Sequence, residues 1–127
     1  MNKNKISVII PAFNEEENII KVLNIVKKSD IVDEVIVVDN ACTDNTAKVS
    51  IEIGAKVVYC EKQGKGYAME EGIKNCKNEI LVFLDADVLY EDTIVEILAE
   101  PIISGRADFV KSTFNRTCRR NCNQYGY

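Results

Sequence analysis

The sequence predicts an α/β fold in which helices cover both faces of a mainly parallel, Rossmann-like, doubly wound sheet. Four short apolar runs support this prediction, because they are nearly continuous in Val and Ile, as in strands buried on both faces. Segments with helical apolar periodicity lie between the runs. A length of 127 residues suits one domain with its own core.

The predicted strands coincide with the four apolar runs, at residues 6–10, 34–38, 56–59 and 80–84, and a fifth strand is expected at 108–112. Strands that alternate with helices in this order favour parallel pairing and right-handed crossovers. In such sheets, ligands bind beyond the carboxyl ends of the strands. The loops that follow the strands are therefore where function is expected.

The predicted helices span residues 15–28, 43–54, 65–75 and 91–104. The first is predicted from an apolar face made by Ile19, Ile20, Leu23 and Val26. Thr43 is the expected cap of the second, and Gly54 is expected to end it. Pro101 lies late enough in the fourth helix to kink it rather than prevent it.

Composition excludes several classes of protein. A net charge of −4 argues against a nucleic-acid binder. The absence of histidine excludes Ser-His-Asp and Cys-His catalysis within this chain, so any metal must be held by oxygen. The five cysteines lack the spacing of a zinc site. No segment is predicted to be an export signal or a membrane span, so we expect a cytoplasmic location and reduced thiols.

Polar or conformationally special residues follow three of the predicted strands. These residues are Pro11, Ala12, Phe13 and Glu15 after the first strand, Asp39 and Asn40 after the second, and Asp85, Ala86 and Asp87 after the fourth. Because parallel strands end at one edge of a sheet, the three groups are expected to converge.

Asp85 and Asp87 are the candidate metal site. Two carboxylates held this close repel each other, and a divalent cation between them and an anionic ligand relieves the repulsion. Oxygen ligands favour Mg²⁺ or Mn²⁺, which take further oxygens from water or a diphosphate. The alternative is a solvated turn with a helix-capping aspartate.

Other polar residues admit two interpretations. Asn14 and Glu15 can cap the following helix as well as face a ligand. Asp39 can accept a hydrogen bond from a base imide, or it can form an Asx-turn. Main-chain groups of Ala12 and Phe13 are free to face a planar base, because Pro11 fixes the exit of the chain from the strand.

Gly64, Lys65 and Gly66 form a short glycine-bearing turn before a predicted helix. Glycines allow close backbone approach, the helix N-terminus offers donors, and the lysine adds a positive charge for a phosphate. Lys111 and Arg116 can reach an anionic acceptor or serve as surface charge.

The ordered motifs PAFNEE, VVDN with TDNT, QGKGYAMEEGI and FLDADV resemble the family 2 glycosyltransferases of GT-A fold, over residues 6–92. The resemblance implies a nucleoside-diphosphate-sugar donor whose base and ribose meet Pro11, Ala12, Phe13, Glu15 and Asp39. It further implies that Lys65 lies near the base or diphosphate, Asp85 near the ribose, and Asp87 on the metal. Asn40, Gly64 and Ala86 complete the predicted nucleotide-sugar-binding residues, and no catalytic residue is assigned.

Residues 96–116 further resemble the glucosyl-3-phosphoglycerate synthases. That resemblance implies a UDP- or GDP-glucose donor and a small phosphorylated acceptor such as 3-phosphoglycerate. Complete members of the family continue well beyond this chain, so residues 1–117 are predicted to be a truncated half domain and residues 118–127 a tail. The activity of this chain alone stays open, and an exposed sheet edge favours a homodimer.

Two alternatives remain beside an enzyme of this kind. One is a non-catalytic nucleotide-binding or regulatory domain, and the other is a fragment of a polyprenyl-phosphate sugar transferase. A nucleotidyltransferase is disfavoured, because its loop after the first strand should be basic and rich in glycine, whereas PAFNEE is acidic and contains none.

Overall fold

Strands and helices alternate along the chain. The structure is a computed structural model and describes residues 5–110. The elements are β1 (Ile6–Ala12), α1 (Ile19–Val26), β2 (Val32–Asp39), α2 (Thr46–Ile53), β3 (Lys56–Tyr59), α3 (Lys65–Lys74), β4 (Ile80–Phe83) and α4 (Ile94–Ile103).

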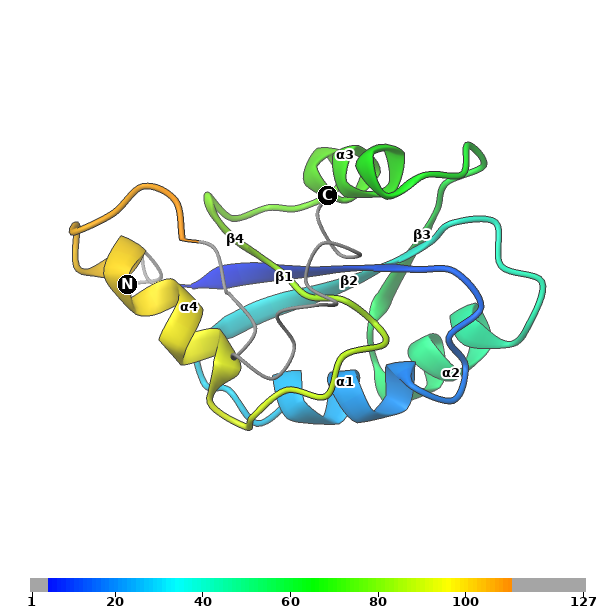
Figure 1. Ribbon diagram of the computed structural model, residues 1–127, viewed down its shortest axis with the longest axis horizontal. Helices are drawn as coiled ribbons and strands as arrows, with labels where there is room; N and C mark the ends of the chain where they lie inside the picture. Colours follow the sequence, from blue (N-terminus) through cyan, green and yellow to red (C-terminus); the bar gives the residue numbers. More distant parts are fainter. Residues whose placement is uncertain (1–4, 111–127) are drawn as a thin grey trace, which may run out of the picture.

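The strands form one parallel sheet in the order β3-β2-β1-β4 (Figure 1). Ala12 at the end of β1 is opposite Asp39 at the end of β2, and Asp39 is in turn opposite Tyr59 on β3. The carboxyl ends of the strands therefore meet at one edge, which confirms the predicted α/β, Rossmann-like fold.

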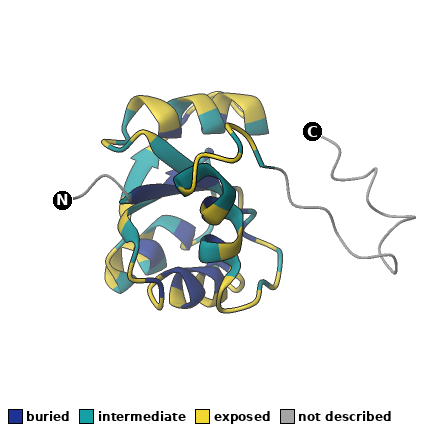
Figure 2. Ribbon diagram, turned by 90° about the vertical axis from the view of Figure 1, so that its left-hand side faces the viewer, coloured by how far each residue is buried: buried dark blue, intermediate teal, exposed yellow. Residues whose placement is uncertain are grey.

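Helices pack on both faces of the sheet and divide its core into two parts. Val8 and Ile10 of β1 belong to the larger part, which α1, α2 and α4 cover. Ile9 belongs to the smaller part, which α3 covers with Ala68. Successive side chains of a strand point to opposite faces, which is why one apolar run serves both parts of the core. Figure 2 shows the buried residues gathered in and around the sheet, while much of α3 is exposed.

Three helices begin later than predicted, at residues 19, 46 and 94 instead of 15, 43 and 91. The predicted caps are wrong, because Asn14 and Thr43 bond to each other across two loops instead of capping the helices that follow them. The residues that precede α1 and α2, Asn18 and Asn45, make no side-chain capping bond either. The prediction for Gly54 is confirmed, since it ends α2 in the left-handed conformation with φ of 106°.

Two further expectations need correction. Ile20 is 36% exposed and does not belong to the buried face of α1, where Val22 and Ile25 lie instead. Residues 108–110 are not a strand, and the remainder of the predicted fifth strand, like Lys111, Arg116 and the predicted tail, lies outside the described residues. Among residues 5–110, no helix combines the length and the apolar character needed to cross a bilayer.

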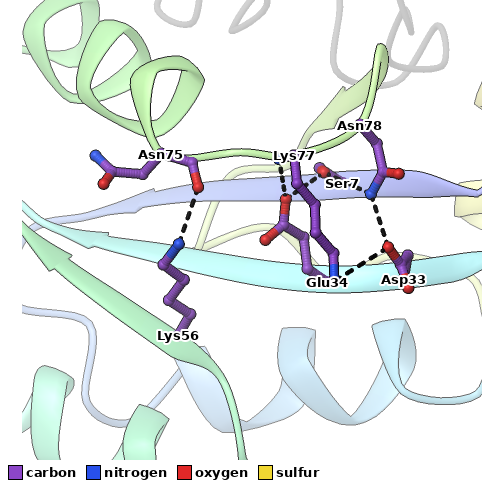
Figure 3. A network of polar contacts seen from close by, with 7 residues as sticks. All are labelled: Ser7, Asp33, Glu34, Lys56, Asn75, Lys77 and Asn78. Carbon is purple, nitrogen blue, oxygen red and sulfur yellow. Dashed lines mark hydrogen bonds and ion pairs between the residues drawn. The ribbon is translucent and has the colours of Figure 1, made fainter.

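A polar network joins the strands to the connection between α3 and β4 at the amino edge of the sheet (Figure 3). The hydroxyl of Ser7, which is fully buried, donates to Oε2 of Glu34 over 2.6 Å, and the N–H of Lys77 donates to the same oxygen over 2.6 Å. Asn78 donates to Ser7 and to Asp33 over 3.0 and 3.1 Å. The hydrogen bond from Asn78 is the main cause of the lowered pKa of Asp33. This network fixes the start of β4 opposite the functional edge.

Gly72 allows α3 to pack closely on the sheet. A Cβ atom at this position would lie 2.4 Å from Cγ2 of Ile9 and 3.3 Å from Cγ2 of Val38. We expect Gly72→Ala to lower the free energy of unfolding by about 1–3 kcal/mol, because overpacking displaces the helix or the strand. Urea unfolding measures this change. Gly66→Ala is the matched control, since a Cβ there meets nothing within 4 Å, and equal stability of the two variants would contradict the prediction.

Candidate functional site

A pocket of about 240 Å³ lies at the carboxyl edge of the sheet. Loops that follow β1, β2 and β4, together with the start of α3, contribute to its walls. The lining residues are Pro11, Ala12, Phe13, Glu15, Asn40, Lys65, Asp85, Ala86 and Asp87. All of them belong to the set that the sequence singled out, so the structure brings these residues together as the parallel sheet requires.

Asp39 and Gly64 complete that set but do not line the pocket. The carboxylate of Asp39 accepts the N–H of Cys42 over 2.8 Å, which is the turn-forming role described above as the alternative to base binding. Gly64 precedes α3 with φ of 142°, in the region that glycine adopts without strain. Each residue precedes a lining residue in the sequence, Asp39 before Asn40 and Gly64 before Lys65.

The side chain of Asn40 holds the loop between β3 and α3. Asn40 is buried, and its amide nitrogen donates to the carbonyl oxygens of Cys60 and Lys62 over 3.1 and 2.9 Å. Its Oδ1 accepts the N–H of Gly64 over 3.0 Å. Since both ends of the carboxamide are used in this way, Asn40 fixes the position at which α3 begins, and with it the position of Lys65.

Charged groups from α3 and from the end of β4 meet in the pocket. Lys65 forms an ion pair with Oδ1 of Asp85, and both side chains are about three-quarters buried. Asp87, two residues further on, is exposed. Lys65 thus offsets the charge of Asp85 and reduces the repulsion between the two carboxylates, while Asp87 remains open to a ligand.

Tyr90 contacts the segment that follows β4, and the sequence analysis did not identify it as a site residue. Its hydroxyl oxygen accepts the N–H of Asp85 over 2.7 Å. Burial is the main cause that raises the pKa of Tyr90 to about 12, and the charges of Asp85 and Asp87 add to the effect. From sequence alone, an aromatic residue after a strand is assigned to the hydrophobic core, so no pattern in the sequence could have indicated this contact.

The exposed carboxylate of Asp87 suits a divalent cation as an oxygen ligand, whereas Asp85 is paired with Lys65. Within residues 5–110, no group of three or more Asp, Glu or Cys side chains could hold a metal ion. A cation here would therefore need further oxygens from water or from a bound diphosphate, which is how Mg²⁺ and Mn²⁺ commonly bind. The donor set thus suits a metal that arrives with its ligand.

Two residues beside the pocket have positive φ without being glycine. Asn14 in the loop after β1 has φ of 54°, and Ala41 in the loop after β2 has φ of 62°. Such conformations are uncommon and cluster at functional sites. Cys42 links the two loops, since its Sγ accepts the N–H of Asn14 and donates to the carbonyl of Ala12. Burial raises the pKa of the Cys42 thiol, which is therefore neutral at neutral pH.

The family model for glycosyl transferase family 2 matches residues 7–121. The chain is 34% identical over 123 residues to a glucosyl-3-phosphoglycerate synthase of Mycobacterium tuberculosis, a match that covers 87% of this chain and 38% of the relative. It is 31% identical over 105 residues to protein RfbJ of Shigella flexneri, covering 83% of this chain and 81% of that protein. The match to the 4,4'-diaponeurosporenoate glycosyltransferase of Staphylococcus haemolyticus is 40% identical over 90 residues, 65% of this chain and 24% of that enzyme.

Solved structures of the M. tuberculosis synthase superpose with a TM-score of 0.74 at 34% sequence identity, over 80% of this chain and about 40% of theirs. One of them is a complex with Mn²⁺, UDP and glucosyl-3-phosphoglycerate, and another holds Mn²⁺, UDP-glucose and phosphoglyceric acid. This chain therefore spans well under half of the length of that relative.

The raised pKa of Tyr90 predicts a dependence of stability on alkaline pH. Because the folded state favours the neutral phenol, the stabilisation is complete below the unfolded pKa of about 10 and is lost as the pH rises towards 12. We expect Tyr90→Phe to remove this part of the decline in the free energy of unfolding. Urea unfolding at several pH values between about 9 and about 11.5 measures the slope.

Tyr59→Phe is the control for this measurement, since Tyr59 is 60% exposed on β3. Tyr90→Phe should also destabilise the protein at neutral pH by about 1 kcal/mol, because the N–H of Asp85 loses its acceptor. A pH slope that is the same in both variants would show that Tyr90 does not contribute.

Proposed function

The chain belongs to glycosyltransferase family 2, and from that premise we propose that the pocket at its carboxyl edge binds a nucleoside-diphosphate sugar together with a divalent cation. One observation carries the proposal: Lys65, Asp85 and Asp87 line one pocket together with the end of β1 and the loop that follows it. A positive side chain, an exposed carboxylate and main-chain groups beside a half-exposed aromatic ring are the features that a nucleoside diphosphate requires.

The loop after β1 is the proposed contact of the base. Phe13 is 49% exposed although it is a large apolar residue, which leaves its ring accessible to a planar ligand. Pro11 and Glu15 line the pocket on either side of it. The ribose would then lie towards Asp85, which lines the same pocket.

The cation would be held by Asp87. When bound, such a metal offsets the charge of the diphosphate and stabilises the nucleoside diphosphate as a leaving group. Lys65 adds a second positive charge on the same side of the pocket, at the N-terminus of α3. The two Asp side chains therefore have different roles: Asp85 is paired with Lys65, and Asp87 is left for the metal.

The donor that we propose is UDP-glucose or GDP-glucose, and the acceptor is a small phosphorylated molecule such as 3-phosphoglycerate, by analogy with the M. tuberculosis synthase. Mg²⁺ and Mn²⁺ both suit the oxygen ligands. We place this activity in the cytoplasm. Within the described part of the chain, β4 is an outermost strand of the sheet. A homodimer formed by pairing along β4 would cover its unpaired side.

Binding of UDP should depend on Mn²⁺ and on Asp87. We expect Asp87→Asn to weaken UDP binding in the presence of Mn²⁺ by about tenfold or more, because a carboxylate ligand of the metal is lost, and to leave metal-free binding nearly unchanged. Titration calorimetry with and without Mn²⁺ measures both affinities.

Asp30→Asn is the matched control, because Asp30 is exposed in the connection before β2, at the amino edge of the sheet. This variant removes the same charge and should bind UDP as the wild type does. The proposal fails if the wild type does not bind UDP, or if Mn²⁺ raises the affinity of wild type and Asp87→Asn equally.

Release of UDP separates an enzyme from a nucleotide-binding domain. If the full chain transfers glucose, then mixing it with UDP-glucose, Mn²⁺ and 3-phosphoglycerate releases UDP in step with the glucosylated product. A protein whose melting temperature rises with UDP and Mn²⁺, but which releases no UDP, has the non-catalytic role instead.

A further inference from the structure

Hydrogen bonds in both directions join the loop after β1 to the loop after β2. Oδ1 of Asn14 accepts the N–H groups of Thr43 and Asp44, over 2.8 and 3.3 Å. In the opposite direction, the N–H of Glu16 donates to Oδ2 of Asp44 over 3.2 Å. These contacts cross between segments that are about thirty residues apart in the sequence.

A relay through Thr46 adds a second connection. The N–H of Glu15 donates to Oγ1 of Thr46 over 2.8 Å, and this hydroxyl donates in turn to Oδ1 of Asp44 over 2.5 Å. Thr46 is fully buried, so water cannot compete with Asp44 and Glu15 for its hydroxyl group. Because the hydroxyl proton points at Asp44, a lone pair of the oxygen faces the N–H of Glu15.

These bonds satisfy donors that no helix satisfies. α1 begins at Ile19, so the N–H groups of Glu15 and Glu16 lie before its first turn and have no partner within it. The two oxygens of Asp44, one directly and one through Thr46, supply the acceptors. Asp44 therefore acts on the loop after β1 as a capping residue would, although it lies in a different loop.

The same loop forms a wall of the pocket. Phe13 and Glu15 line it, whereas Asp44 and Thr46 do not. Asp44 therefore does not touch the proposed ligand itself, but it hydrogen-bonds to the segment that would touch the ligand. Its influence on binding must pass through the shape of that segment.

Asp44 accepts these bonds as a carboxylate. Burial raises its pKa, but the hydrogen bonds from Thr46 and from the N–H of Glu16 outweigh that effect, and the pKa lies below its usual value. Hydrogen bonds to a charged acceptor are about twice as strong as those between neutral groups. The ionised side chain therefore suits a fixed loop better than a neutral amide would.

We infer that Asp44 is a positioning residue of the donor site: through Thr46 and the N–H of Glu16, it holds residues 13–16 in the shape that lines the pocket. The inference rests on the proposed function for the identity of the ligand. The arrangement of the loop in the free protein follows from the contacts alone.

The test compares Asp44→Asn with Thr46→Val and Thr46→Ser in the full chain. Asparagine turns one acceptor into an N–H₂ group that faces a donor, and valine removes the acceptor of the Glu15 N–H at nearly equal volume. Both changes should weaken UDP binding by roughly tenfold. Thr46→Ser keeps the hydroxyl and should bind UDP as the wild type does.

Dependence on the metal separates this effect from that of Asp87. The affinity for UDP should fall by the same factor with and without Mn²⁺ in Asp44→Asn, since the altered wall does not hold the metal, whereas Asp87→Asn loses affinity only with Mn²⁺. If the affinity of the folded protein stays unchanged while its melting temperature falls, Asp44 has a purely structural role and the inference is overturned.

Hydrogen exchange in the ligand-free protein gives a second, independent result. Asp44→Asn should accelerate exchange at the amides of Glu15 and Glu16, and Asp30→Asn should not. If those amides exchange equally in both variants, the inference is wrong, whether or not UDP binds. If wild type fails to bind UDP but the amides respond as expected, the proposed function fails and the positioning of the loop stands.

Discussion

The parallel pairing of β1 with β2 on one side and with β4 on the other determines where the loops of the candidate site lie. Val37 and Val38 of β2 lie opposite Ile10 and Pro11, and the N–H of Leu84 continues the pairing of β4 by donating to the carbonyl of Ile9. All strands consequently end at one edge, and the loops that leave them must share it. Side chains more than seventy residues apart in sequence meet there for this reason alone.

Polar side chains then fix the loops relative to one another. Asp44 joins the first two loops, and Asn40 joins the second to the start of α3. The ion pair of Lys65 with Asp85 connects α3 to the end of β4, which Tyr90 supports. These contacts connect the four segments in series, from the loop after β1 to the end of β4. A site held in this way pays less conformational entropy when it binds a ligand.

The pattern of the sequence was enough to predict the four strands of the sheet, because a buried strand requires an apolar run, but residues 108–110 of the expected fifth strand are not a strand. The run from Ile6 to Ile10 is apolar at four of its five positions, as expected of a strand that helices cover on both faces. The place of the site follows from the topology, because parallel strands bring the residues that follow them together at one end of the sheet. Eight of the nine pocket residues were identified for this reason, whereas Lys65 was identified from the glycine-bearing turn before α3, and the binding roles of all nine remain proposals.

The polar contacts could not be predicted, because they join loops whose spacing only the folded sheet defines. Asn14 and Thr43 have the side chains of helix caps, and sequence rules assign such residues to the helix that follows them. In the structure they bond to each other instead, which is why the helices begin later. Tyr90 went unnoticed since its role lies in one hydroxyl oxygen, whereas its ring packs like any core residue.

Paramagnetic broadening of amide resonances can test whether a metal and a nucleoside diphosphate bind together at the carboxyl edge of the sheet. Mn²⁺ added with UDP to the isotopically labelled chain should broaden the resonances of Ala86 and Asp87 first and those of Phe13 and Lys65 next. Lys77 and Asn78, at the amino edge, should remain sharp (Figure 3). Broadening that is uniform, or that centres on the amino edge, would rule out the proposed metal site at the carboxyl edge.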